Sequence, residues 1–228
     1  MMNSRLDNPF TEAEIAECYC RHSDNYHNRP NAFEAFTGLV PPKSRVFEIG
    51  VGTGAFTELL LSFGYDVRGI DESEEMLRRA SEQVRTLSER CNLSDYDSSG
   101  KYDVVVSHSG GFTFKRGKFE TYYQSKDDLE RAFQKVYDVL NDKRAFLVNK
   151  GEHGCDVDLG DRATLSIAQE EGGSSRTYTF SFKHDSKEIT RRQRRLALAP
   201  EELQEMSSQY FNWNFDDGLW MIGGRKHD

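Results

Sequence analysis

Residues 45–55 read R-V-F-E-I-G-V-G-T-G-A, a short apolar strand that leads into a glycine-rich turn and then into a helix. The glycines alternate along the turn, at Gly50, Gly52 and Gly54. Glycine permits a tight turn and lets a ligand approach the main chain closely. The helix behind the turn begins with N–H groups that lack a helical partner and suit an anionic or carboxylate-bearing ligand. This stretch therefore predicts a ligand site between a strand and a helix.

An acid stands at the end of the next strand. Residues 65–70 are strand-like, and Asp71 follows them about twenty residues after the glycine turn, where a carboxylate can accept hydrogen bonds from two ribose hydroxyls. The turn and Asp71 together predict a site for a nucleoside cofactor. Three alternating glycines and a correctly placed acid disfavour the structural alternative, which is a tight turn with a capping acid.

Strand-like and helical segments alternate around this turn. Helices are predicted at 55–63, 73–88 and 127–140, and strands at 45–50, 65–70, 86–91, 102–107 and 145–149. Strands that alternate with helices form a parallel sheet with right-handed crossovers. After residue 150 the pattern changes, because strands at 162–169, 176–182 and 188–198 around a turn at 171–174 predict an antiparallel addition. A helix from Pro200 and a hairpin over 210–223 follow.

Composition narrows the classes of protein to consider. The chain has 228 residues and a formal net charge of −8, with 12% aromatic residues. Collagen, a coiled coil and a disulfide scaffold are excluded, and no run approaches the roughly 18 apolar residues of a membrane span. The acidic balance disfavours nonspecific binding to nucleic acid. Four scattered cysteines lack a metal-binding or redox spacing, so we expect reduced thiols, no metal site, no signal peptide and a cytoplasmic location.

The glycine turn fits two families of nucleoside cofactor. Gly50-x-Gly52-x-x-Ala55 satisfies the dinucleotide fingerprint, so an NAD-dependent oxidoreductase is one reading. Glu48 within the strand and Gly54 as the third glycine point elsewhere, because this pattern resembles motif I of class I S-adenosylmethionine-dependent methyltransferases, E/D-x-G-x-G-x-G, over residues 45–150. The resemblance implies an α/β fold with a Rossmann-like, mostly parallel seven-stranded sheet flanked by helices. The antiparallel β addition predicted after residue 150 follows the fifth strand, as it does in the glycine and deoxyaminosugar N-methyltransferases of this class.

The resemblance assigns S-adenosylmethionine as the cofactor and S-adenosylhomocysteine as its product. The glycines would lie against the amino-acid part, Asp71 would hold the ribose, and Glu48 would orient the turn or bond the ammonium group indirectly. Glu72, next to Asp71, is a further expected cofactor residue. Met76 looks like the residue that packs on adenine, although ordinary core is an equal reading. Asn92 and Leu93 occupy the place of the family's adenine-binding acid, where the amide oxygen of Asn92 could accept the same hydrogen bond. Ser107, at the end of the fourth strand, completes the expected cofactor set.

A narrower likeness is to glycine and deoxyaminosugar N-methyltransferases, which carry a tyrosine-rich N-terminal helix over the cofactor. Tyr19 and Tyr26 resemble residues of that lid, and Arg21 or Arg29 could pair with the methionine carboxylate; surface and core tyrosines are the alternative. The expected organisation is one domain over 1–228, with a helical lid (1–40), a cofactor-binding core (41–150), an antiparallel insertion (151–199) and a terminal helix and hairpin (200–228).

Methyl transfer requires a nucleophile held in line with the methyl group and freed of its proton. His108, in the loop after the fourth strand, is the best candidate for a general base because its ordinary pKa lies near neutrality. Glu152 and His153, after the fifth strand, are the second candidates. A histidine that only lines the pocket is the alternative for His108.

The acceptor is expected to be a small molecule. Phe112 could wall its site, and Arg192 and Arg194 of the basic run 191–195 could bind an anionic acceptor; a solvated face, or binding of RNA, are the other readings of that run. The predicted function is methyl transfer to an N or O nucleophile of a small molecule, such as an anionic or natural-product intermediate. An NAD-dependent oxidoreductase, a protein or RNA methyltransferase and a non-enzymatic binding module are the alternatives. A homodimer is compatible with the sequence.

Overall fold

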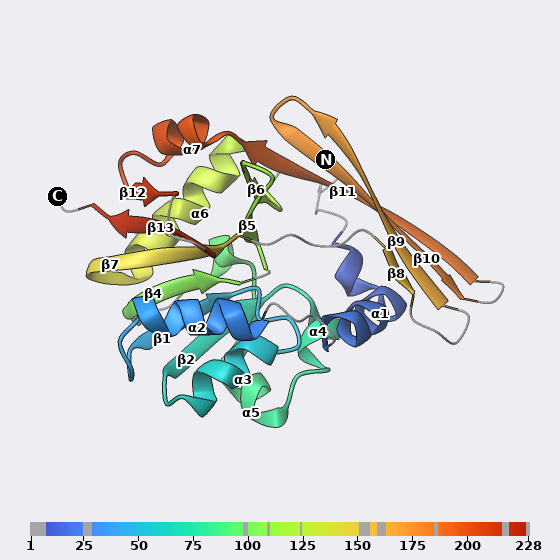
Figure 1. Ribbon diagram of the computed structural model, residues 1–228, viewed down its shortest axis with the longest axis horizontal. Helices are drawn as coiled ribbons and strands as arrows, with labels where there is room; N and C mark the ends of the chain where they lie inside the picture. Colours follow the sequence, from blue (N-terminus) through green and yellow to red (C-terminus); the bar gives the residue numbers. More distant parts are fainter. Residues whose placement is uncertain are drawn as a thin grey trace.

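A computed structural model describes residues 8–24, 29–97, 100–108, 110–123, 125–150, 156–158, 163–184, 187–215 and 219–226. These residues form two sheets that lie side by side, with helices around the first of them (Figure 1). Within the described residues, no helix is long and apolar enough to cross a membrane.

The first sheet has seven strands in the order β12-β13-β7-β4-β1-β2-β3. Their bounds are β1 (Arg45–Ile49), β2 (Asp66–Asp71), β3 (Ser88–Arg90), β4 (Tyr102–Ser107), β7 (Leu140–Asn149), β12 (Phe211–Asn214) and β13 (Trp220–Arg225). The first five pair in parallel, while β13 runs antiparallel to β7 and to β12. The predicted mostly parallel, seven-stranded α/β sheet is therefore confirmed.

Helices cover both faces of this sheet. Alternate residues of each strand point to opposite sides, and the apolar side chains on both sides are buried under helices. On one face, Val46 and Val104 pack with α2 (Arg29–Leu39) and α3 (Ala55–Ser62). On the other face, Phe47 and Val105 pack with α6 (Lys126–Val139) and the short η2 (Leu93–Asp95). The helix α7 (Pro200–Met206) follows the second sheet. Each face of the first sheet thus has its own apolar cluster, and the glycine turn follows β1 between them.

The helix predicted over 73–88 is two helices, α4 (Glu74–Leu77) and α5 (Glu82–Leu87). Ser73 caps the first by accepting a hydrogen bond from Met76 N, and Ser81 caps the second by accepting one from Val84 N. Ser81 has non-helical backbone angles, so the chain stops and restarts there. The apolar spacing continues across this break, which is why periodicity alone predicted one helix.

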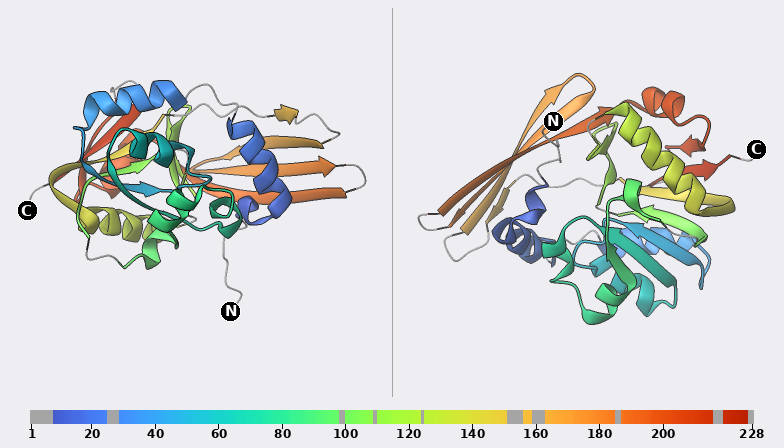
Figure 2. Two further views of the ribbon diagram at one scale, coloured as in Figure 1. Left: turned by 90° about the horizontal axis from the view of Figure 1, so that it is seen from below. Right: turned by 180° about the vertical axis from the view of Figure 1, so that it is seen from behind.

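The second sheet is antiparallel, in the order β5-β6-β11-β10-β9-β8. Its strands are β5 (Phe112–Lys115), β6 (Lys118–Thr121), β8 (Asp156–Asp158), β9 (Ala163–Gly172), β10 (Ser175–His184) and β11 (Lys187–Leu198). The expected antiparallel addition is present, and the long strands β9–β11 project away from the first sheet (Figure 2). The β5–β6 hairpin was not predicted. Its two-residue turn at Arg116 and Gly117 has positive φ at both positions, as a tight hairpin turn requires.

The N-terminal segment, with η1 (Pro9–Thr11) and α1 (Ala13–Asp24), lies between the two halves of the molecule (Figures 1 and 2). Ile15 packs against Tyr178 and Phe180 of β10. Cys20 packs against Met76 of α4. The first helix therefore bridges the antiparallel sheet and the region of the glycine turn.

Candidate functional site

The glycine turn is fastened to the end of β2. The backbone N–H groups of Gly50 and Val51 both donate to the carbonyl of Ile70, at 2.8 and 3.1 Å. Gly50 and Gly54 have φ of 78° and 82°, and a Cβ on them would lie 2.3 Å from Gly110 Cα and 2.5 Å from a Val84 methyl group respectively. Only glycine fits these positions, because both the backbone conformation and the neighbouring chain exclude a side chain.

Asp71 is joined directly to this turn. Its Oδ2 accepts from Gly52 N at 2.8 Å and its Oδ1 accepts from Ser73 N at 2.7 Å. Burial raises the pKa of Asp71, and these two hydrogen bonds oppose that rise. Each carboxylate oxygen has a second acceptor site, so the pair can still bind two hydroxyl groups. The sequence-based pairing of Asp71 with the glycines is thus a direct contact in the structure.

Glu48 lies beneath the turn with 2% of its surface exposed. Its Oε2 accepts from the hydroxyl of Thr57 in α3 at 2.6 Å, which ties β1 to the helix after the turn. Burial raises the pKa of Glu48 to about 8, the Thr57 hydrogen bond lowers it, and the nearby charge of Asp71 raises it. The carboxyl group is therefore mostly protonated at neutral pH. This arrangement is consistent with a residue that orients the turn.

Met76 covers the middle of the turn. Its side chain is 6% exposed, and its Cε lies 3.4 Å from the place where a Cβ on Gly52 would be. The Sγ of Cys20 lies 4.0 Å from the Sδ of Met76, and Tyr19 and Phe10 pack at the edge of the same group, with their ring centroids 4.7 Å apart. Met76 and Tyr19, predicted for the cofactor site, are thus brought together beside Gly52.

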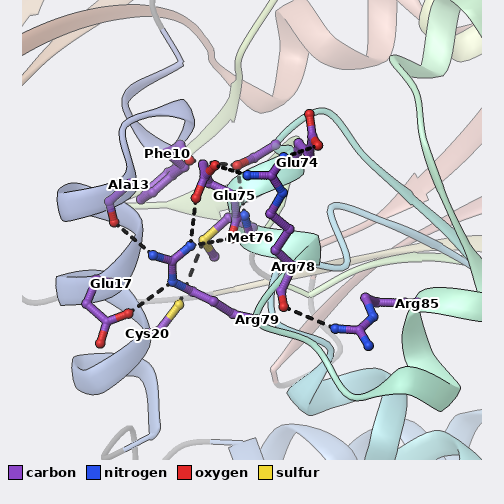
Figure 3. Close-up of polar contacts among 11 residues, drawn as sticks. Phe10, Ala13, Glu17, Cys20, Glu74, Glu75, Met76, Arg78, Arg79 and Arg85 are labelled. Atoms are coloured by element: carbon purple, nitrogen blue, oxygen red, sulfur yellow. Dashed lines mark hydrogen bonds and ion pairs between the residues drawn. The ribbon is translucent and has the colours of Figure 1, made fainter.

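Polar contacts hold α1 against α4 at this place (Figure 3). Arg79 donates from Nε to Glu17 Oε2 at 3.1 Å and from Nη2 to the carbonyl of Ala13 at 3.1 Å, while Nη1 bonds Glu75 within α4. Ser73 Oγ donates to the carbonyl of Phe10 at 2.6 Å. The N-terminal segment is therefore clamped over Met76 by two residues of the α4 region.

The two residues expected at the adenine amino group are arranged differently from the prediction. Asn92 Oδ1 accepts from Ser94 N at 2.9 Å and from Ser94 Oγ at 2.7 Å, so both its lone pairs are in use. Its Nδ2 donates to Glu72, another predicted cofactor residue. The side chain of Leu93 is buried in the core against α6. In this conformation the amide oxygen of Asn92 is not available as the expected acceptor, because Asn92 serves as the cap of η2.

Two residues near the end of β4 also differ from the prediction. Ser107 is fully buried, and its hydroxyl donates to the carbonyl of Phe112 at 2.9 Å and accepts from Phe112 N at 3.2 Å. Phe112 has no exposed surface and packs among Phe119, Phe133 and Phe146. The hydroxyl of Ser107 thus fastens β4 to β5, and Phe112 is part of the core instead of a wall of the substrate site.

His108, the candidate base, is partly exposed. Its ring stacks on that of Phe56, with centroids 4.4 Å apart and an interplanar angle of 1°, and lies 6.1 Å from the ring of Trp220. Phe56 belongs to α3, directly after the glycine turn. The other candidates, Glu152 and His153, lie outside the described residues, as do Tyr26 and the side chains of Arg21 and Arg29.

The two arginines of β11 that were expected to bind an anionic acceptor face solvent, as in the alternative reading of this run. Arg192 and Arg194 are exposed, whereas Gln193 and Arg195 are buried, with 1% and 9% of their surfaces exposed. Arg195 lies between the rings of Tyr122 and Tyr178, with its Cζ 4.1 and 4.4 Å from their centroids. The register that pairs Tyr178 with Gln193 puts the apolar side of β10 and Arg195 on one face. The alternation of Tyr178, Phe180 and Phe182 is the sequence signal that could have identified the buried face of β10 and, through the register, of β11.

The acidic and thiol groups of the described residues do not form a metal centre, since no three His, Cys, Asp or Glu side chains gather there. The site therefore consists of the glycine turn, the carboxyl groups of Glu48 and Asp71, Met76 under α1, and the nearby ring of His108. These groups can bind a ligand that carries hydroxyl groups and a flat apolar ring.

Comparisons with known proteins agree with this geometry. Residues 46–143 match the family described as "Methyltransferase domain". A glycine/sarcosine N-methyltransferase from Halorhodospira halochloris is 24% identical over 124 residues, which are 51% of this chain and 43% of that protein. The chain thus spans about two fifths of the length of the curated relatives it matches.

Solved structures share the whole fold. The CcbJ methyltransferase from Streptomyces caelestis matches with a TM-score of 0.70 and 18% identity, over 96% of this chain and 98% of that one. CalS10 from Micromonospora echinaspora, an amino pentose methyltransferase solved with S-adenosylmethionine bound, matches with a TM-score of 0.61 and 13% identity, over 87% and 90% of the two chains. At these identities the likeness is one of fold.

Proposed function

We propose that this chain, which carries a methyltransferase domain at residues 46–143, binds S-adenosylmethionine and transfers its methyl group to an N or O nucleophile of a small molecule. The observation that carries the proposal is the direct bond between the Asp71 carboxylate and the glycine turn, with Glu48 buried beneath. This contact supports the proposal, because it brings together the acid proposed to bind the ribose, the backbone turn and the strand acid of the methyltransferase pattern.

The residues present fit this cofactor. The backbone of Gly50, Gly52 and Gly54 would hold its amino-acid part, the carboxylate of Asp71 its ribose hydroxyls, and Met76 its adenine. Asp71, bonded to the turn, and the adjacent Glu72 are acidic residues, which suits a ligand with ammonium and sulfonium charges. When bound, the cofactor supplies a methyl group on a positively charged sulfur, which is activated for transfer without a metal ion.

The chain's own residues would supply the rest of the chemistry. The segment 8–24, held over Met76 by Arg79 and Ser73, is proposed as the lid that excludes water from the reacting groups. His108 is proposed as the base that accepts the proton of the acceptor's amine or hydroxyl group. Glu152 and His153 remain the second proposal for that role. Stacking of His108 on Phe56 fixes the plane of its ring, as a positioned base requires.

The nature of the acceptor is proposed from the relatives. The names of the glycine/sarcosine and amino pentose methyltransferases specify small acceptors that contain an amine. An amine nitrogen is therefore the first acceptor to test, with hydroxyl compounds second.

Calorimetry tests the cofactor first. The protein is titrated with S-adenosylhomocysteine and, separately, with NADH. The proposal expects binding of S-adenosylhomocysteine, and tight binding of NADH alone would instead favour an oxidoreductase. A screen of small amines and hydroxyl compounds with methyl-labelled cofactor then tests transfer. If the cofactor binds but no acceptor in a broad screen is labelled, the chain is a binding module.

A further inference from the structure

The inner face of the antiparallel sheet carries polar side chains among its aromatic ones. Glu120 on β6, Arg176 and Tyr178 on β10, and Gln193 and Arg195 on β11 are all at most 9% exposed. The strand register pairs Arg176 with Arg195 and Tyr178 with Gln193, so these side chains are neighbours. Buried charges are stable only when a counter-charge or hydrogen bonds compensate for the lost water. Each buried arginine of this face therefore requires a compensating group.

Two arginines of this region have carboxylate partners. Arg176 Nη1 donates to Glu120 Oε1, and the hydroxyl of Tyr178 donates to Glu120 Oε2. Burial and the hydrogen bond to Glu120 raise the pKa of Tyr178 to about 12, so this hydroxyl stays protonated. Arg191 forms an ion pair with Glu12 of the N-terminal segment. The one described carboxylate within this buried group, Glu120, is therefore already occupied.

Arg195 has a different set of partners. Its Nε and Nη2 donate to Gln193 Oε1 at 3.1 and 3.0 Å, and Nη2 also donates to the hydroxyl of Tyr122 at 3.0 Å. Its guanidinium is sandwiched between the rings of Tyr122 and Tyr178. These partners are neutral, and no carboxylate within the described residues lies at ion-pair distance from it. Cation–π contacts of this kind offset only part of the cost of a buried charge.

Gln193 adds a second unsatisfied group. Its side chain is 1% exposed, and its Nε2 has no hydrogen-bond partner among the described residues. An unpaired buried donor costs about 1–3 kcal/mol. A cation without an anion and an amide donor without an acceptor thus lie next to each other on one strand. One ligand with negatively charged oxygens could neutralise the guanidinium of Arg195 and accept the hydrogen bond of Gln193 Nε2.

The position of this pair connects it to the proposed cofactor site. Tyr122, which covers one face of Arg195, donates its backbone N–H to the carbonyl of Gly111 at 3.4 Å, and Gly110 packs against Gly50 of the glycine turn. Burial raises the pKa of Tyr122 most, and the charges of Asp71 and Glu72 raise it further against the effect of Arg195. The other face of Arg195 is covered by Tyr178, which packs on Ile15 of the lid. Tyr122 therefore connects Arg195, through Gly111 and Gly110, to the glycine turn.

The solvent-exposed part of this pair belongs to Arg195, because Gln193 is buried. Arg195 keeps 9% of its surface exposed, and Tyr122 is partly exposed. A guanidinium held flat between two rings is pre-organised to bind a carboxylate or phosphate through two parallel hydrogen bonds. In a chain with a net charge of −8, this is a local cationic site with no anion of its own among the described residues.

We propose that Arg195, with Gln193, binds an oxyanion, a carboxylate or a phosphate, carried by the methyl acceptor and so selects anionic acceptors. This inference rests on the proposed function, because the oxyanion is assigned to the molecule that receives the methyl group.

The test measures binding of two probe anions, acetate and inorganic phosphate, by calorimetry. Each is titrated into the protein with and without saturating S-adenosylhomocysteine. Arg195→Gln should weaken binding of the preferred anion about tenfold or more. Lys183→Gln, which also removes one positive charge but from an exposed position on β10, should leave it unchanged. A preference for acetate or for phosphate identifies which oxyanion the acceptor carries.

A second variant keeps the test decisive if Arg195→Gln does not fold. Gln193→Glu places a carboxylate beside Arg195, so it should abolish binding of both anions and raise the thermal midpoint of unfolding. Absence of anion binding to the wild-type protein, or equal losses in Arg195→Gln and Lys183→Gln, overturns the proposal. Failure of S-adenosylhomocysteine to bind contradicts the proposed function separately, because the anion titrations without it still decide the role of Arg195.

Discussion

At the scale of single residues, Glu48 links pH to stability. Its pKa is about 8 in the folded protein, against 4.5 without burial. A raised carboxyl pKa means that the unfolded chain loses this proton at lower pH than the folded chain. The contribution of Glu48 to the free energy of unfolding is therefore fully present below about pH 4.5 and is lost as the pH rises to about 8.

Glu48→Gln should remove this dependence. The amide oxygen can still accept the hydrogen bond of Thr57, but the side chain cannot ionise. We expect the variant to match the wild type at pH 4 and to exceed it at pH 8.5 by several kcal/mol at most, since one pKa unit corresponds to about 1.4 kcal/mol. Urea unfolding at both pH values measures the difference. Parallel pH profiles for the two proteins would contradict the buried, protonated state.

Asp71 is predicted to act on cofactor affinity. Its carboxylate bonds the backbone of Gly52 and retains acceptor sites for ribose hydroxyls. Asp71→Ala should weaken binding of S-adenosylhomocysteine roughly tenfold or more, because hydrogen bonds to a charged group contribute about 1.5–3 kcal/mol. Asp66→Asn, at the exposed start of the same strand, is the matched control. Unchanged affinity in Asp71→Ala would remove this residue from the site.

His108 is predicted to act on turnover. His108→Phe keeps an aromatic ring against Phe56 but cannot accept a proton. We expect turnover to fall by roughly 10²-fold or more, with the affinity for S-adenosylhomocysteine and the thermal midpoint unchanged. Single-turnover rates with an acceptor from the screen provide the measurement. A variant as active as the wild type would assign His108 to packing alone.

At the scale of elements, the contact between α1 and α4 decides how the proposed lid is held. Arg79 joins the two helices through Ala13 and Glu17, whereas the neighbouring Arg78 bonds Glu74 and Glu75 within its own helix (Figure 3). A single arginine therefore supplies much of the polar contact between α4 and the lid.

Arg79→Gln should loosen the lid without unfolding the core. We expect several-fold faster dissociation of S-adenosylhomocysteine and faster amide hydrogen exchange in residues 13–20, because fewer contacts oppose local opening. Arg78→Gln is the control and should change neither quantity. Equal exchange rates in wild type and Arg79→Gln would show that Arg79 does not hold this helix, and that the Ser73–Phe10 hydrogen bond and the apolar contacts of Ile15 and Cys20 suffice.

The spacing of apolar residues predicts some of the strands and misses others. The strand Tyr102–Ser107 is found at the predicted residues, because a β-branched run buried on both sides has one stable conformation. The hairpin of β5 and β6 was missed, since its aromatic residues alternate as in a strand but were interpreted as a loop. That hairpin adds two strands to the second sheet and brings Tyr122 to Arg195.

At the scale of the whole molecule, the two sheets share a core, in which Phe112 and Phe119 of the second sheet pack with Phe146 of the first. The helix α1 contacts the second sheet through Ile15 and the α4 region through Cys20. The division of the chain into lid, core, insertion and terminal hairpin stays a prediction. So do a small-molecule partner and a homodimer.

The sequence by itself determined the glycine turn, Asp71 and the alternation of strands and helices. Each depends on residues close together in the chain: positive φ at glycine, caps at Ser73, and the spacing of apolar side chains. The tertiary structure decided which arginine is buried, which carboxylate is occupied, and which acceptor oxygen Ser94 uses. Those facts depend on strand register and on contacts between distant segments, as between Glu120 and Arg176 or Tyr122 and Arg195, and no local pattern contains them.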